Sequence, residues 1–230
     1  GDAVAEGLEL GEWETFFQIR RDLMREVPFY SALGNHEWDS TLYFDLFDLP
    51  GNERYYSFKA GDALFIVLDS EGLIPIDLPV SEKAEESFLF YFERQIAWLE
   101  ETLDANADAP FVFAAMHRPM YSVNSDRQFE TTLNRLRWGD IFERHHVQVV
   151  FSGHNHHYHH AQNNGTHYVT TGGGGGHLRD IDDIQPETVL TEKVHHHVVV
   201  DVEENEATLT AIDVDGAIVE TFVVYTRLAT

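Results

Sequence analysis

The chain has 230 residues, 43% of them hydrophobic and 13% aromatic, which is enough for one sizeable core and too few for two comfortable domains. Its 40 acidic residues against 15 basic ones give a formal net charge of -25, which disfavours a general role in binding nucleic acid, because the nucleic-acid backbone is itself negative. The absence of cysteine excludes disulfides, thiolate metal sites and cysteine nucleophiles. No apolar stretch approaches the roughly 18 residues of a membrane span.

The first two thirds of the chain alternate predicted helices and strands. Apolar residues at helical spacing predict helices over residues 13–24, 88–105 and 129–144. Short apolar runs predict strands over residues 29–33, 55–57, 63–68, 111–116 and 147–151. The polar stretch 70–86 contains two prolines and is predicted to be a long surface loop.

The last third is predicted to be rich in β-structure. Predicted strands cover residues 168–171, 194–202, 207–212 and 218–224, with Asp215-Gly216 as a hairpin turn signal. Five consecutive glycines, residues 172–176, predict a loop that other groups approach closely. Helix–strand alternation followed by a β-meander predicts packed sheets with helices outside, and no linker or internal repeat divides the chain.

Three polar clusters each follow a predicted strand directly. They are Gly34-Asn35-His36-Glu37, His117-Arg118-Pro119 and Gly153-His154-Asn155-His156. Ligands in α/β folds collect on loops beyond the carboxyl ends of strands, so the three clusters can converge on one site. Imidazole nitrogens and an amide oxygen suit divalent metals such as Mn, Fe, Zn, Co or Ni. One histidine after a strand is more often simply solvated, but the ordered set predicts a metal site.

In these blocks the sequence resembles the calcineurin-like metallophosphoesterases, most closely their acid-phosphatase-like branch, which is related to the purple acid phosphatases. The match continues through residues 117–122, 164–169 and the glycine loop into the β-meander, and so covers essentially the whole chain. The resemblance implies an α/β fold: a four-layer αββα sandwich of two mixed β-sheets flanked by helices, as a single domain over residues 1–230.

The resemblance also implies a function. It indicates a metal-dependent phosphoric ester hydrolase with a dinuclear centre, in which a metal-bound hydroxide attacks a small phosphate ester. A phosphomonoesterase is the first reading and a phosphodiesterase the alternative. No nucleic-acid partner and no membrane span are expected. The sequence leaves the localisation open between secreted, periplasmic and cytoplasmic.

Metal ligands can be carried over residue by residue. The resemblance implies that Asp2, in the Gly1-Asp2 block, bridges two metals. Asn35, His117 and His154 would complete the second metal site, and His156 would bind the first metal.

Other residues receive roles outside the ligand set. His36 is implied to be the catalytic residue, which stabilises the transition state or protonates the leaving oxygen, with Glu37 orienting its ring. Arg118 either contacts a phosphate oxygen or packs on the surface, and both readings stay open. His177, after the glycine loop, is a weaker candidate for approaching the metals or the substrate. The remaining histidines are interpreted as ordinary strand or helix-end residues.

One block of the family pattern, Asp-x-His or Asp-x-Gly on an opening strand, is absent from the sequence. Ala5 stands where purple acid phosphatases carry a metal-binding tyrosine, so tyrosinate chemistry is not expected. The first metal would keep only Asp2 and His156, which are too few ligands for a durable site. The sequence therefore suggests an N-terminally truncated chain that binds one metal better than two and catalyses weakly. The alternative is a metal-binding or interaction module that keeps the fold without activity.

Overall fold

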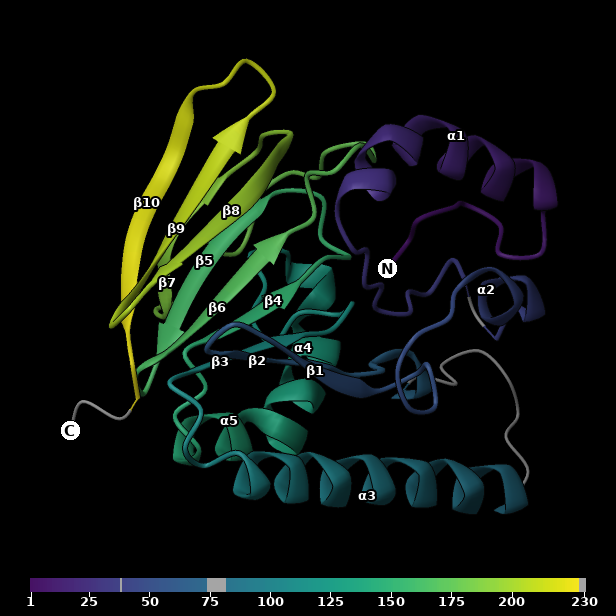
Figure 1. Cartoon of the computed structure of the whole chain (residues 1–230), viewed down its shortest axis with the longest axis horizontal. Helices are drawn as coiled ribbons and strands as arrows, with labels where there is room; N and C mark the ends of the chain where they lie inside the picture. The colour runs from purple at the N-terminus through teal and green to yellow at the C-terminus, as the bar shows by residue number, and fades with distance from the viewer. Residues whose placement is uncertain (38, 74–81, 228–230) are drawn as a thin grey trace.

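The computed structural model describes residues 1–37, 39–73 and 82–227, in which the strands form two sheets that pack face to face (Figure 1). The larger sheet has the order β1-β2-β3-β4-β6-β5-β7. Its strands are β1 Tyr56–Ala60, β2 Ala63–Val67, β3 Phe111–Ala115, β4 Val149–Ser152, β5 Tyr158–Asn163, β6 Thr166–Thr171 and β7 Thr188–Glu192. Strands β2, β3, β4 and β6 are parallel to one another, whereas β1, β5 and β7 pair antiparallel.

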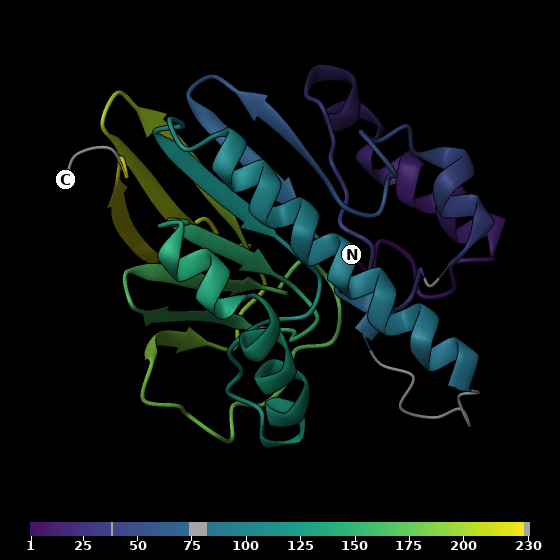
Figure 2. The same ribbon diagram turned by 90° about the horizontal axis from the view of Figure 1, so that it is seen from below.

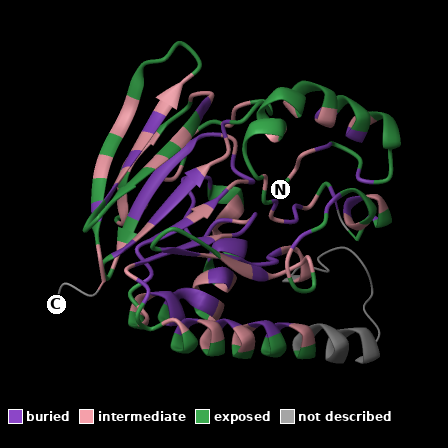
Figure 3. Cartoon of the chain, viewed as in Figure 1, coloured by how far each residue is buried: buried purple, intermediate pink, exposed green. Residues whose placement is uncertain are grey.

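The smaller sheet is an antiparallel meander in the order β10-β9-β8. Its strands are β8 His196–Glu203, β9 Glu206–Asp213 and β10 Ile218–Tyr225. The space between the two sheets is filled by apolar side chains from both inner faces. They include Phe113, Val149 and Val169 from the larger sheet and Leu209 and Val224 from the smaller one. In Figure 3 the central strands of the larger sheet are mostly buried, whereas the strands of the smaller sheet are largely intermediate or exposed.

Helices cover the other face of the larger sheet (Figure 2). They are α3 Glu82–Ala105, α4 Gln128–Asn134 and α5 Asp140–Arg144, with a π-helical turn over Arg135–Gly139 between α4 and α5 and short 3-10 turns at Glu71–Leu73 and Ser125–Arg127. Leu99 of α3 and Phe142 of α5 are fully buried against Val112 and Val150 of the sheet. Both faces of the parallel strands are therefore covered, which explains why β3 is apolar at every position.

The N-terminal segment adds a separate aromatic cluster. Helices α1 Leu10–Glu26 and α2 Thr41–Leu46 pack around Trp13, Tyr43 and Phe47, together with Val67 at the end of β2. Trp13 makes an edge contact with Phe47 at 5.8 Å between ring centroids. In Figure 2 these helices lie on the opposite side of the molecule from the smaller sheet.

The architecture confirms the predicted α/β fold of two sheets with helices outside. One detail differs, because only the larger sheet is mixed and the smaller one is antiparallel throughout its described pairings. Most predicted strands are present, and β7 and α2 are elements that the sequence patterns did not reveal. None of the helices in the described part of the chain is long and apolar enough to cross a membrane.

Residues 29–33, predicted to be a strand, form no regular element. A strand needs a hydrogen-bonding neighbour, and no described strand pairs with this segment. The carbonyl of Ser31 instead accepts hydrogen bonds from the hydroxyls of Tyr43 at 3.3 Å and Tyr56 at 2.7 Å. Leu33 is buried as predicted, whereas Phe29 and Ala32 are half-buried and Tyr30 is exposed. Side-chain hydroxyls replace the strand partner.

Two helix predictions also need correction. Helix α3 begins at Glu82, so the predicted loop ends earlier than residue 86. Glu82 to Glu86 is a run of good helix formers without apolar spacing, which periodicity alone does not detect. The predicted helix over 129–144 is interrupted by the π-helical turn. Residue 38 and residues 74–81, which make up part of the predicted surface loop, lie outside the described residues.

Buried neutral histidines should make the stability of the fold sensitive to acid. Burial lowers the pKa of His157 to about 4 and that of His159 to about 3. Below pH about 6.5 the unfolded chain takes up these protons and the folded chain does not, so stability falls by about 1.4 kcal/mol per pH unit for each group. Urea unfolding of the metal-free protein at pH 7.5 and 5 measures this loss. His159→Gln should reduce the loss of unfolding free energy between the two pH values by the contribution of one histidine. His197→Gln, at an exposed position, should leave this loss unchanged. Equal stability of the wild-type protein at both pH values would contradict the expectation.

Candidate metal centre

The predicted site lies where the parallel strands of the larger sheet end. His117 follows β3 and His154 follows β4, so both come from carboxyl ends at one edge of the sheet. Asp2 and Asn35 come from the N-terminal segment, which packs against the same edge (Figure 1). Residues more than 150 positions apart in the sequence thus meet at one place.

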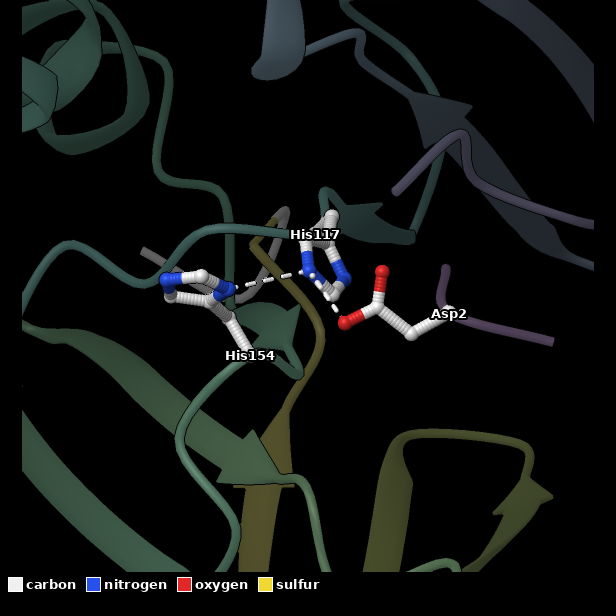
Figure 4. A group of neighbouring side chains, drawn as sticks. All are labelled: Asp2, His117 and His154. Carbon is white, nitrogen blue, oxygen red and sulfur yellow. Dashed lines mark hydrogen bonds and ion pairs between the residues drawn. The ribbon is translucent and has the colours of Figure 1, made fainter. Parts of the chain in front are cut away.

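Three potential metal-ligating atoms converge on the His117 ring, and with its Nε2 they make four. Its Nε2 lies 3.1 Å from Asp2 Oδ2, 3.0 Å from Asn35 Oδ1 and 3.1 Å from His154 Nδ1. Figure 4 shows Asp2, His117 and His154 pointing toward one another, and their donor atoms all lie within 4.8 Å. The sequence assigned four residues to one metal. They are Asp2, Asn35, His117 and His154, which we call the four-donor group.

The charges at this group favour a bound cation. Burial lowers the pKa of His117 to about 3, and burial also lowers that of His154. Both rings are therefore neutral at pH 7, and each carries one N–H and one lone pair. One N–H at His117 Nε2 can satisfy only one of the three acceptors around it. A divalent cation suits a carboxylate oxygen, an amide oxygen and two imidazole nitrogens, so the donor set is compatible with a metal.

The backbone around the group is shaped for close approach. A Cβ on Gly34 would lie 2.4 Å from the backbone nitrogen of Asp2, so any larger residue would push Asp2 out of place. His154 has a φ of 63°, in the left-handed region that costs a non-glycine residue about 1–2 kcal/mol. Such strain is typical of residues fixed by a site.

Glu37 anchors the Asp2 segment. Its carboxylate is buried and accepts hydrogen bonds from the backbone N–H groups of Asp2 at 2.8 Å, Ala3 at 2.6 Å and Gly34 at 2.8 Å. This differs from the hypothesis that Glu37 orients the His36 ring. Glu37 acts on the centre through the backbone of Asp2.

His36 lies beside the four donors without joining them. Its backbone N–H donates to Asp2 Oδ1 at 3.1 Å, and its exposed ring pairs through Nδ1 with the carbonyl of Ala5 at 2.8 Å. The ring is thus fixed next to the centre, yet accessible to a ligand from solvent. This placement suits a residue that contacts substrate.

His156 and His177 are not part of the four-donor group. Among the described residues, no group of three or more possible ligands includes either histidine. The His156 ring donates from Nδ1 to the carbonyl of His177 at 2.8 Å, so it is the backbone of His177 that makes the contact. A Cβ on Gly176 would come within 2.7 Å of the His156 ring, so the glycine loop approaches closely here, as predicted.

Arg118 belongs to a buried ionic network behind His154. Its side chain is 13% exposed and pairs with Glu71 at 3.0 Å and with Glu130 at 2.7 Å. Arg127 lies in the same network, with Nη1 at 2.8 Å from His154 Nε2. Sequence reasoning missed Glu71, Arg127 and Glu130. Only Glu71 carried a usable signal, because it follows the end of a parallel strand as the motif residues do.

Comparisons with known proteins identify relatives of this chain in sequence and in fold. The sequence model of the calcineurin-like phosphoesterase family matches residues 1–158. Purple acid phosphatase 13 of Arabidopsis thaliana is 27% identical over 158 residues, which cover 62% of this chain and 26% of that protein.

Two solved structures share the fold. The structure titled GAP50, the anchor in the inner membrane complex of Plasmodium, has a TM-score of 0.68 at 17% identity and covers 87% of this chain and 67% of that one. The purple acid phosphatase PPD1 of yellow lupin has a TM-score of 0.64 at 19% identity and covers 86% of this chain and 38% of that one. The chain spans about a quarter of the length of the Arabidopsis relative.

Proposed function

Because the chain belongs to the calcineurin-like phosphoesterase family, we propose that it is the metal-binding part of a phosphoric ester hydrolase that acts on small phosphate esters, monoesters first. The observation that carries the proposal is the convergence of Asp2, Asn35, His117 and His154 within hydrogen-bond distance of one ring nitrogen. These four residues would bind a divalent transition metal, with Mn, Fe, Zn, Co and Ni as candidates. When bound, such an ion lowers the pKa of water and neutralises charge on a phosphate.

Other residues of the chain would supply proton transfer and hold the metal ligands in position. His36 would contact the substrate and protonate the leaving oxygen, because its exposed ring lies beside the centre. Its Nδ1 pairs with the Ala5 carbonyl, which directs Nε2 to be the atom that exchanges the proton. Glu37 and Gly34 would keep Asp2 in place without touching substrate.

We propose one well-held metal in this chain, with a second metal as the finer alternative. A second ion would have Asp2 and His156 as its ligands here, and His156 is suited to bind through Nε2 because Nδ1 already donates to His177. Two ligands are fewer than a durable site needs. A metal-binding module without catalytic activity is therefore the second candidate function.

A metal count and a paired activity measurement test the proposal. The purified chain, reconstituted with Mn²⁺ or Zn²⁺, should retain close to one ion after gel filtration. The complete gene product, loaded with metal, should hydrolyse a generic phosphomonoester faster than a generic phosphodiester. Metal uptake with neither activity would favour the non-catalytic module, and no metal uptake would contradict the proposal. Two retained ions in this chain would overturn the one-metal assignment alone.

A further inference from the structure

The far side of the His154 ring contacts groups of opposite charge. Nδ1 faces the four-donor group, whereas Nε2 lies 3.3 Å from Glu130 Oε1 and 2.8 Å from Arg127 Nη1. In Figure 4 the two ring nitrogens of His154 point in opposite directions, with Nδ1 toward His117. His154 and Glu130 are both nearly buried, with side chains 6% and 8% exposed.

These two neighbours require different tautomers of the ring. A neutral imidazole has one N–H. If the proton is on Nε2, the ring donates to Glu130 and the Nδ1 lone pair faces Asp2 and His117. If the proton is on Nδ1, Nε2 accepts from Arg127 and an N–H faces the four-donor group. Only the first form can bind a cation at Nδ1, and metal-ligating histidines commonly donate their other N–H to a carboxylate.

The network behind these residues holds Glu130 in place. Arg118 donates to Glu130 Oε2 at 2.7 Å and is itself paired with Glu71 through Nε at 3.1 Å. Glu130 Oε1 is buried and has no hydrogen-bond partner among the described residues, so it is available to an N–H on His154 Nε2, which lies 3.3 Å away. Arg118 Nη1 also lies 3.2 Å from His154 Nε2 and carries a second N–H, so Arg118 can favour the same tautomer as Arg127.

We propose that Glu130 and Arg127 are positioning residues that set the tautomer of His154 in opposite directions. Glu130 favours the form that binds a metal, and Arg127 favours the form that excludes it. The inference rests on the proposed metal centre. It adds an equilibrium between the two tautomers of His154 that controls how tightly the centre binds a metal. The observed affinity is the intrinsic affinity multiplied by the fraction of the binding tautomer, so both residues act on it without contacting a metal.

Two variants of opposite expected sign test the proposal. In the metal-free protein, the ¹⁵N shifts of the His154 ring report the tautomer directly. Glu130→Met should move the ring toward Nδ1–H and weaken Mn²⁺ binding by about 10- to 100-fold, the range found when such outer partners of metal ligands are removed. Arg127→Met should move the ring toward Nε2–H and tighten Mn²⁺ binding.

Controls separate the tautomer from general charge and folding effects. Asp126→Asn is a charge control, because it removes a negative charge next to Arg127. Asp126 is exposed and pairs with Arg127 and Arg179 rather than with His154, so the variant should leave the ¹⁵N shifts of the His154 ring unchanged. Glu130→Gln retains an oxygen acceptor and should retain most of the Nε2–H form, which keeps the test usable if Glu130→Met fails to fold. Unchanged ring shifts in the Glu130 and Arg127 variants, or shifts in the same direction, would overturn this inference alone. Absence of Mn²⁺ binding by the wild-type chain would instead overturn the proposed function.

Discussion

Replacing His117 by alanine is expected to abolish tight metal binding by the chain. His117 Nε2 is the atom that lies within 3.1 Å of a donor from Asp2, Asn35 and His154, so it is the centre of the group. Loss of an outer partner of a metal ligand typically weakens binding by about 10- to 100-fold, and loss of a ligand should exceed that range. Calorimetric titration with Mn²⁺ or Zn²⁺ measures the change in affinity.

The variant needs a control for its effect on the core. The His117 side chain is 1% exposed, so alanine leaves a cavity whether or not a metal binds. His159→Ala is a matched control, because His159 is also 1% exposed and belongs to β5, away from the four donors. Both variants should lower the unfolding temperature of the metal-free protein, and only His117→Ala should lose the metal. Equal affinities in the two variants would show that the four-donor group is not the metal site.

Replacing His36 by alanine in the complete gene product should lower turnover by about 10²- to 10⁴-fold, the contribution typical of a general acid. Metal content should stay unchanged, because the His36 ring pairs with a backbone carbonyl and is not one of the four donors. Turnover on an activated phenyl ester, whose leaving group needs no proton, should fall much less than turnover on an alkyl ester.

The comparison of the two leaving groups discriminates between roles for His36. An equal loss on both esters would assign His36 to binding the phosphate rather than to proton transfer. Loss of metal together with activity would make His36 a ligand or a structural residue. The exposed His146→Ala, remote from the centre on the loop after α5, is a suitable control that should retain full turnover.

The convergence of the four residues could be predicted from the sequence because His117 and His154 stand in short blocks directly after strands, and Asp2 and Asn35 stand in recognisable Gly-Asp and Gly-Asn-His-Glu blocks. Parallel strands bring such blocks to one edge of a sheet whatever the loops between them do. For the same reason the alternation of helices and strands was enough to predict the architecture. The partners of His154 could not be found in this way. Arg127 and Glu130 form an i,i+3 pair of opposite charge at a helix start, which in a sequence looks like any surface pair.

Residues 29–33 show a different limit of sequence reasoning. Their apolar pattern predicts a buried strand, but only Leu33 of the apolar residues is buried, and a pattern contains no information about whether a neighbouring strand is present. The role of Glu37 was mistaken for a related reason. A carboxylate next to His36 in the sequence suggests a contact between their side chains, yet Glu37 points to the backbone of a segment more than 30 residues away.

The four-donor group is formed by two parts of the chain, the N-terminal segment and the larger sheet, which also share apolar contacts at Tyr56 and Val67. Asp2 and Asn35 belong to the segment built around the aromatic cluster of α1 and α2, whereas His117 and His154 belong to the larger sheet. Direct polar contacts of His117 with Asp2 and Asn35 connect the larger sheet to the N-terminal segment. An ion bound by all four residues would therefore connect the N-terminal segment to the larger sheet, in addition to any part in catalysis. Its removal would weaken the attachment of the N-terminal segment at the site, while the apolar contacts of the aromatic cluster with Tyr56 and Val67 would stay in place.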